Sequence, residues 1–259
     1  MRLIEEIEQQ MEKTAVWYLG GPTIIIQTRG CIIYVDPFLG PSVNPQWTRR
    51  FEPQIEATSI RKVDYVLITH EHRDHCHEMT IKTFEQNLRP EYFLPRASLA
   101  QIYGEYGIHI DDDRVHEVKA GDRFYLSEIE LLVFPSTDQT AQEAVAYLIS
   151  TAEGKIFHPG DVLYVPSFFD AVKQCEPDIA FLPLGKNPAG WNVYPDKADF
   201  VKLAEEIAAK LTIPIHWDLW NESYIDAGDL ENSIRNPRIK VVPRGTKLLL
   251  PLEDKPVVT

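Results

Sequence analysis

Three histidines and one aspartate follow an apolar run in the first third of the chain. Residues 66–68 have the composition of a buried strand, and the polar residues that follow are His70, His72, Asp74 and His75. Imidazole and carboxylate groups at the end of a buried strand need a partner that offsets their desolvation. Zinc and similar divalent metals are such partners. The spacing x-H-x-H-x-D-H divides the four residues into two ligand pairs, His70 with His72 and Asp74 with His75.

The same histidines could instead cap a helix or line a polar surface. The chain has only eight histidines in 259 residues, and three of them stand within residues 70–75 beside an aspartate. Histidines with a purely structural role are not expected to cluster in this way. The pattern therefore favours a metal site.

Three further residues of the same kinds follow short apolar runs, namely Asp36, Asp161 and His216. Their order around the H-x-H-x-D-H loop resembles the metallo-β-lactamase superfamily. Members of that superfamily carry an early Asp, the loop, a later His, a bridging Asp and a final His. The resemblance covers nearly the whole chain, and it implies a dinuclear metal site at the edge of a ββ sandwich.

One element departs from the common pattern. Where the family has its third histidine, residues 135–140 offer Asp138 as the only strong ligand type. Together with residues 158–161, 184–188 and 213–220, this aspartate resembles the L-ascorbate-6-phosphate lactonase branch. Members of that branch are cytoplasmic, manganese-using hydrolases of a phosphorylated sugar lactone, and the present chain is shorter than they are.

The resemblance assigns His70, His72 and Asp138 to one metal, Asp74, His75 and His216 to the other, and Asp161 to a bridge between them. It implies that two cations activate a water, which then attacks an ester or lactone carbonyl. Asp74 and Asp161 are the expected catalytic residues, with Asp74 orienting the nucleophile. A carboxylate in place of a histidine makes the first site harder, which favours Mn²⁺ without excluding Zn²⁺. His158 is an alternative to Asp138 at the first metal.

Four residues are candidates for contact with a small anionic substrate: Asp36, Lys186, Asn187 and Trp217. Asp36 is the first element of the family pattern. Lys186 and Asn187 follow a buried run and could supply a cation and an amide, although Asn187 before a proline also fits an ordinary turn. Trp217, like Trp191 and Trp220, could form the wall of a sugar-sized pocket or belong to the core.

Strands and loops must position these residues. Apolar runs predict two β-rich stretches, residues 15–35 and 115–158, and the second half of the chain adds helix–strand alternation. Periodicity alone supports a mixed α/β (α+β) fold. The family resemblance implies a four-layer αββα sandwich. No internal repeat or Pro/Gly/Ser-rich linker divides the chain, which predicts one domain over residues 1–259.

Composition limits the partners. The net charge of −13 disfavours nucleic acid, because affinity for phosphates rests on Lys and Arg. The longest apolar runs are much shorter than a membrane span, so no membrane partner is expected. The acidic, amphipathic residues 2–13 are unlike a secretory signal and predict a helix on the sandwich or at a subunit contact, which would suit a homo-oligomer. Three widely separated cysteines argue for a reducing, cytoplasmic location.

The leading hypothesis is a metal-dependent hydrolase of a small anionic ester, namely a lactone of a phosphorylated sugar or sugar acid. A phosphodiesterase or nuclease of the same fold is one alternative, which the net acidity disfavours. A catalytically silent metal-binding module is another, suggested by the missing third histidine. The sequence leaves open the substrate, the identity of the metal and the oligomeric state.

Overall fold

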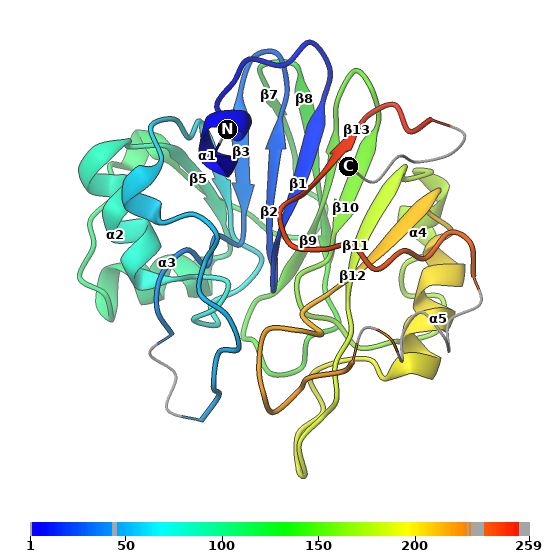
Figure 1. Ribbon diagram of the computed structural model, residues 1–259. Coiled ribbons are helices and arrows are strands. Elements are labelled where there is room, and N and C mark those ends of the chain that lie inside the picture. The colour runs from blue at the N-terminus through cyan, green and yellow to red at the C-terminus, as the bar shows by residue number, and fades with distance from the viewer. Residues whose placement is uncertain (1, 43–45, 227, 229–235, 254–259) are drawn as a thin grey trace.

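Two β-sheets lie face to face in the computed structural model, which describes residues 2–42, 46–226, 228 and 236–253 (Figure 1). The first sheet has the strand order β13 (Thr246–Leu249), β1 (Ala15–Gly20), β2 (Thr23–Gln27), β3 (Ile32–Val35), β4 (Tyr65–Leu67), β5 (Glu91–Leu94) and β6 (Val115–Glu117). The second has the order β12 (Leu211–Ile215), β11 (Ile179–Pro183), β10 (Lys155–His158), β9 (Val145–Ser150), β8 (Ile129–Pro135) and β7 (Arg123–Leu126).

The main hydrophobic core fills the space between the two sheets. Side chains alternate between the two faces of a strand, and β1 shows how each face is used. Val16 and Tyr18 join the core together with residues of β8 and β11, whereas Trp17 packs in a second apolar cluster on the outer face of the first sheet. Strands β1, β2 and β3 are therefore apolar on both faces, as expected for strands with both faces covered.

Helices cover the outer face of each sheet (Figure 1). Against the first sheet lie α1 (Leu3–Ile7), α2 (Glu78–Asn87) and α3 (Arg96–Gly104); against the second lie α4 (Asp170–Gln174) and α5 (Lys197–Ile207). Helix α5 begins where the side chain of Asp196 accepts a hydrogen bond from the backbone N–H of Asp199, and it ends at Ala208, whose φ is 56°. Short 3₁₀ turns occur at Ala57–Ser59 and Asp112–Arg114. The sequence-based expectation of a four-layer αββα sandwich is confirmed.

The amino-terminal helix is shorter than the sequence predicted. It ends at Ile7, and the chain then leads into β1 without further helix. Ile4 and Ile7 are buried against the first sheet, so α1 lies on the sandwich, which is one of the two expected locations. Among the described residues, none of the helices combines the length and apolar character needed to span a bilayer.

The strand directions gather the functional residues at one edge of the sandwich. Strands β3, β4, β5 and β6 are parallel, as are β10, β11 and β12. Strand β8 is antiparallel to β9, which is antiparallel to β10, so β8 runs in the same direction as β10. Because the carboxyl ends of such strands meet at one edge, the segments after β3, β4, β8, β10 and β12 lie together.

Candidate metal centre

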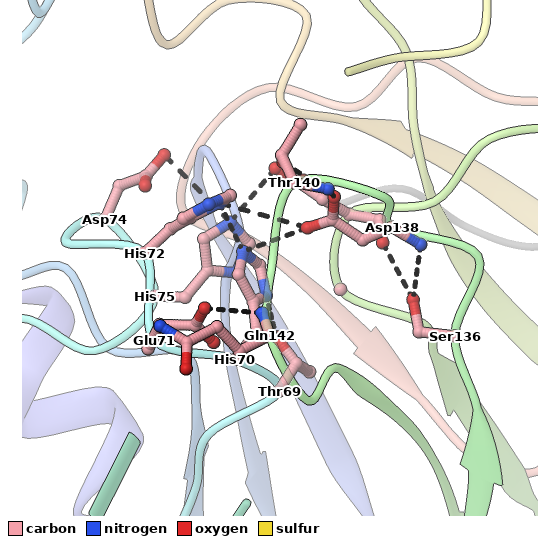
Figure 2. A network of polar contacts seen from close by, with 12 residues as sticks. Thr69, His70, Glu71, His72, Asp74, His75, Ser136, Asp138, Thr140 and Gln142 are labelled. Carbon is pink, nitrogen blue, oxygen red and sulfur yellow. Dashed lines mark hydrogen bonds and ion pairs between the residues drawn. The ribbon is translucent and has the colours of Figure 1, made fainter. Parts of the chain in front are cut away.

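Four segments supply the predicted ligands. The loop after β4 carries the H-x-H-x-D-H residues, and Asp138, Asp161 and His216 follow β8, β10 and β12 respectively. Figure 2 shows Asp138 facing the rings of His70 and His72 across a narrow gap. The loop after β4 is held as a tight turn, because the carbonyl of His72 accepts hydrogen bonds from the backbone N–H groups of His75 and Cys76, at 2.9 and 2.7 Å.

The first ligand cluster consists of His70, His72 and Asp138. The Nε2 of His70 lies 2.9 Å from the Nδ1 of His72, and the Oδ2 of Asp138 lies 3.7 and 3.9 Å from these two atoms. This Oδ2 is buried and has no hydrogen-bond partner. A buried carboxylate oxygen in that state needs a cation or a donor, so the cluster is suited to a metal ion.

The second cluster consists of Asp74, His75 and His216. The Nε2 atoms of His75 and His216 are 3.1 Å apart. The Oδ2 of Asp74 lies 3.5 Å from the Nε2 of His216 and 4.0 Å from the Nε2 of His75. The indole N–H of Trp220 donates to the same Oδ2 of Asp74 at 3.2 Å. This hydrogen bond fixes the orientation of the carboxylate toward the two histidines.

Asp161 lies between the two clusters. Its Oδ2 is 3.5 Å from the Nε2 of His75, and its Oδ1 is 3.4 Å from the Nε2 of His216. Potential ligand atoms of Asp161, His70 and His75 also lie within 4.8 Å of one another. Its Oδ1 is buried and unpartnered. Burial alone would raise the pKa of Asp161, but His216, His75 and His70 together hold that pKa well below its usual range. The carboxylate is therefore charged and available to both clusters.

The electrostatics divide the histidines. Burial lowers the pKa of His70 well below its ordinary value, and the neighbouring His75 and His72 lower it further. Burial also acts to lower the pKa of His75, but Asp161, Asp36 and Asp74 outweigh it and raise that pKa well above normal. An arrangement of carboxylates that favours positive charge at His75 equally favours a bound cation.

One buried carboxylate sets the tautomers of two ligands. The Nδ1–H of His75 donates to the Oδ2 of Asp36 at 2.7 Å, and the hydroxyl of Thr69 donates to the same oxygen at 2.6 Å. The Thr69 oxygen can then accept from the Nδ1–H of His70, 3.0 Å away. Both histidines are left with the lone pair of Nε2 facing the centre, as a metal ligand requires.

His158, which the sequence made the alternative to Asp138, uses its ring for hydrogen bonds to the backbone. Its Nε2 donates to the carbonyl of Pro22 at 2.8 Å, and its Nδ1 accepts from the N–H of Gly160 at 3.2 Å. Both ring nitrogens are thus occupied by backbone. Of the two candidates, only Asp138 belongs to the first cluster.

The sequence-predicted substrate contacts lie elsewhere. A cavity of about 330 Å³ opens beside the clusters, and none of the four predicted residues lines it. Asp36 is fully buried under His75, so it supports a ligand and does not fit the assigned substrate contact. Asn187 uses its amide to hold a loop, donating to the carbonyl of Tyr194 and accepting from the N–H groups of Val193 and Tyr194. Trp217 lines a different cavity, and Lys186 is exposed outside this one.

The described residues that line the cavity are Gln46, Trp47, Glu71, His72, Arg73, Asp74, Gln101, Thr140, Asp161, Trp191, Val193 and Tyr194. Sequence reasoning missed the role of Tyr194, whose ring packs against that of His216 at an angle of 34°, with centroids 4.9 Å apart. It also missed Trp47, which contacts Trp191 and Trp220 edge-on or tilted. No local pattern marks these aromatic residues, because they reach the centre from loops that are distant in sequence.

The model of the β-lactamase superfamily domain matches residues 15–216, and the chain belongs to that superfamily. It is 25% identical to the probable L-ascorbate-6-phosphate lactonase UlaG of Escherichia coli O127:H6, with 88% of this chain and 77% of the relative covered. It is 26% identical to the protein of the same name from Shigella flexneri, with 92% and 80% covered.

A solved structure has the same fold. Igni18, a metallo hydrolase from Ignicoccus hospitalis, superposes with a TM-score of 0.71 at 15% identity, over 93% of this chain and 100% of that one. Together with the family match and the lactonase relatives, this makes the chain a hydrolase of the metallo-β-lactamase fold. Its His and Asp clusters could bind metal.

Proposed function

We propose that the protein is a metal-dependent lactonase, acting on a lactone of a phosphorylated sugar or sugar acid. The observation that carries the proposal is the convergence of two His/Asp clusters on one cavity, with the buried and unpartnered oxygens of Asp138 and Asp161 facing them. The similarity to probable L-ascorbate-6-phosphate lactonases over most of the chain supports the substrate class.

Two divalent cations, Mn²⁺ or Zn²⁺, are the proposed cofactors. His70, His72 and Asp138 would hold one, Asp74, His75 and His216 the other, with Asp161 shared between them. Mixed nitrogen and carboxylate oxygen donors suit both metals, and two carboxylates at or near the first cluster shift the preference toward the harder Mn²⁺. When bound, these ions supply Lewis acidity and lower the pKa of a water at neutral pH.

The protein's own groups then orient the reaction. Asp74, whose Oδ2 is held by the Trp220 N–H, lines the cavity, and its carboxylate can accept the proton of an attacking water. Asp161 lines the same cavity and carries its negative charge at the junction of both clusters. The aromatic faces of Trp47 and Trp191 provide an apolar wall on which a sugar ring can lie.

The cavity size and net charge support a small substrate over a polymer. A volume of about 330 Å³ is at the lower end of ligand pockets, and a net charge of −13 repels nucleic acid. We further propose that the chain acts in the cytoplasm, since its cysteines are free in the structure. We propose that it does so as one domain, since a single core joins residues from Val16 to Leu250.

Turnover of two substrate panels tests the proposal. The purified protein, loaded with Mn²⁺ or Zn²⁺, is assayed with sugar lactones and their phosphate esters, and separately with nucleotide and aryl phosphodiesters. We expect lactone opening, with His70→Ala and Asp161→Ala each abolishing it and lowering the bound metal measured by elemental analysis. Hydrolysis of phosphodiesters alone would support the phosphodiesterase alternative, and metal binding without any turnover would support the silent module.

A further inference from the structure

The cavity beside the metal centre contains one basic side chain. Among its described lining residues, Arg73 is the sole Lys or Arg, and the remaining charged groups there are His72 and the carboxylates of Glu71, Asp74 and Asp161. Lys186, the cation that the sequence suggested for an anionic substrate, does not line this cavity. Recognition of a phosphate or carboxylate on the substrate therefore needs a different residue.

Arg73 stands between two ligands, which fixes its backbone relative to the metal centre. It is flanked by His72 and Asp74, and the turn that holds them is closed by two hydrogen bonds to the His72 carbonyl. The distance from the Arg73 backbone to the reacting carbonyl is thus set by the same loop that positions the ligands. A substrate held both by Arg73 and by the metal centre would be oriented for attack.

The guanidinium of Arg73 is pre-positioned by the turn after α3. It forms an ion pair with Glu105 and lies over the ring of Tyr106, with 5.9 Å from the guanidinium carbon to the ring centroid. The hydroxyl of Tyr106 donates to the carbonyl of Cys76 at 2.8 Å, which ties this turn to the ligand loop. The side chain is held near the cavity before any substrate arrives.

The same guanidinium still has donors to offer. Arginine carries five N–H donors, and the hydrogen bond to Glu105 involves only Nη2. The side chains of Arg73 and Glu105 are 42% and 48% exposed, and an ion pair at such a position contributes little stability. A substrate phosphate or carboxylate can therefore bind the Arg73 guanidinium beside Glu105, or displace Glu105 from it, at a small cost in stability. The new contact would be bidentate and charge-assisted.

We infer that Arg73 binds the anionic group of the substrate and so determines the preference for phosphorylated or carboxylated lactones. This inference rests on the proposed lactonase function and specifies how the substrate lies. The lactone carbonyl is at the metal centre, the sugar ring is against Trp47 and Trp191, and the anionic group is at Arg73.

The test compares a six-carbon sugar lactone with its 6-phosphate ester, using metal-loaded wild type and Arg73→Gln. For the phosphorylated lactone we expect kcat/KM to fall about 10- to 100-fold, mainly through KM, which is the range of one lost charge-assisted hydrogen bond. For the unphosphorylated lactone kcat/KM should change less than about threefold, since that substrate has no anionic group for Arg73 to bind. Arg73→Lys should recover part of the preference for the phosphorylated lactone, because lysine keeps the positive charge but cannot form the bidentate hydrogen bonds of a guanidinium.

Arg89→Gln is the matched control, because Arg89 forms a similar exposed ion pair with Asp111 outside the cavity. It should leave both substrates unaffected. Equal effects of Arg73→Gln on the two lactones, or no effect on either, would overturn the inference and leave the lactonase intact. If the wild type opens neither lactone, the proposed function fails and the inference fails with it.

Discussion

Asp36→Asn should weaken metal binding although Asp36 touches no metal. Its carboxylate is fully buried and accepts three hydrogen bonds. The Oδ1 accepts from the backbone N–H of Thr69 at 2.8 Å, and the Oδ2 accepts from the Thr69 hydroxyl at 2.6 Å and from His75 Nδ1 at 2.7 Å. Asparagine has the same shape but replaces one of the two acceptor oxygens with an NH₂ donor.

Either orientation of the new amide is unfavourable. If its NH₂ faces His75, the ring must turn its Nδ1 into an acceptor, which moves the proton to Nε2 and removes the lone pair from the second cluster. If its NH₂ faces the Thr69 backbone, two buried donors oppose each other. The first case costs metal affinity, and the second costs stability.

The expected magnitudes follow from the hydrogen bonds that the substitution removes. Loss of a hydrogen-bonded support behind a ligand histidine typically weakens metal binding about 10- to 100-fold. A buried donor left without an acceptor costs about 1–3 kcal/mol of unfolding free energy. We expect one effect or a mixture of the two, depending on how the amide orientations are populated, and any loss in affinity should be concentrated on the ion held by His75.

Calorimetric metal titration of the apo-protein and urea unfolding measure the two effects. Asp178→Asn is the control, because Asp178 is 8% exposed and accepts from the Lys155 N–H at 2.7 Å and from Lys210 Nζ at 2.6 Å, away from the clusters. It should lose stability but keep metal affinity. If Asp36→Asn keeps the wild-type unfolding free energy and also binds metal within about twofold of the wild type, the argument from its hydrogen bonds is refuted.

Three further changes have defined outcomes. Burial lowers the pKa of His77 to about 4, so from pH 7 to 5 the unfolded chain takes up a proton that the folded protein does not, and wild type should lose about 1–2 kcal/mol more stability in urea than His77→Gln. Asp138→Ala should release one metal selectively on dialysis, whereas Asp138→His should keep both and shift preference toward Zn²⁺ by elemental analysis. Gly160→Ala should destabilise the protein by more than about 1 kcal/mol in urea, because φ is +66° and the added Cβ would lie 2.5 Å from the Thr69 hydroxyl oxygen. If a variant behaves like the wild type in its assay, the role assigned to the substituted residue is wrong.

The ligand loop was predictable because its information is local. Its four ligand residues follow one strand within a few positions, so composition and spacing alone suggested two ligand sets. Asp138, Asp161 and His216 each follow a strand that points the same way, and the edge rule for such strands brings them to the loop. The clusters needed only strand ends and directions, which apolar runs and the family resemblance supply.

The substrate side was not predictable in the same way. Trp217 and Trp220 are three residues apart after β12, yet Trp217 lines a separate cavity and Trp220 bonds to Asp74. Lys186 and Asn187 belong to a loop whose amide contacts are internal. Which side chain of a loop reaches a cavity depends on backbone turns and distant packing, and no period in the sequence encodes them.

The backbone at two functional residues explains why those turns escape sequence reasoning. Asp36 and His216 have φ values of 45° and 69°, in the left-handed region that non-glycine residues rarely adopt. Each such residue costs about 1–3 kcal/mol, and it persists only where neighbouring contacts outweigh that cost. For Asp36 those contacts are the bonds to Thr69 and His75, which bend the chain as soon as β3 ends. The strain and the ligand geometry therefore share one cause, because the network that orients the histidines also imposes the turn.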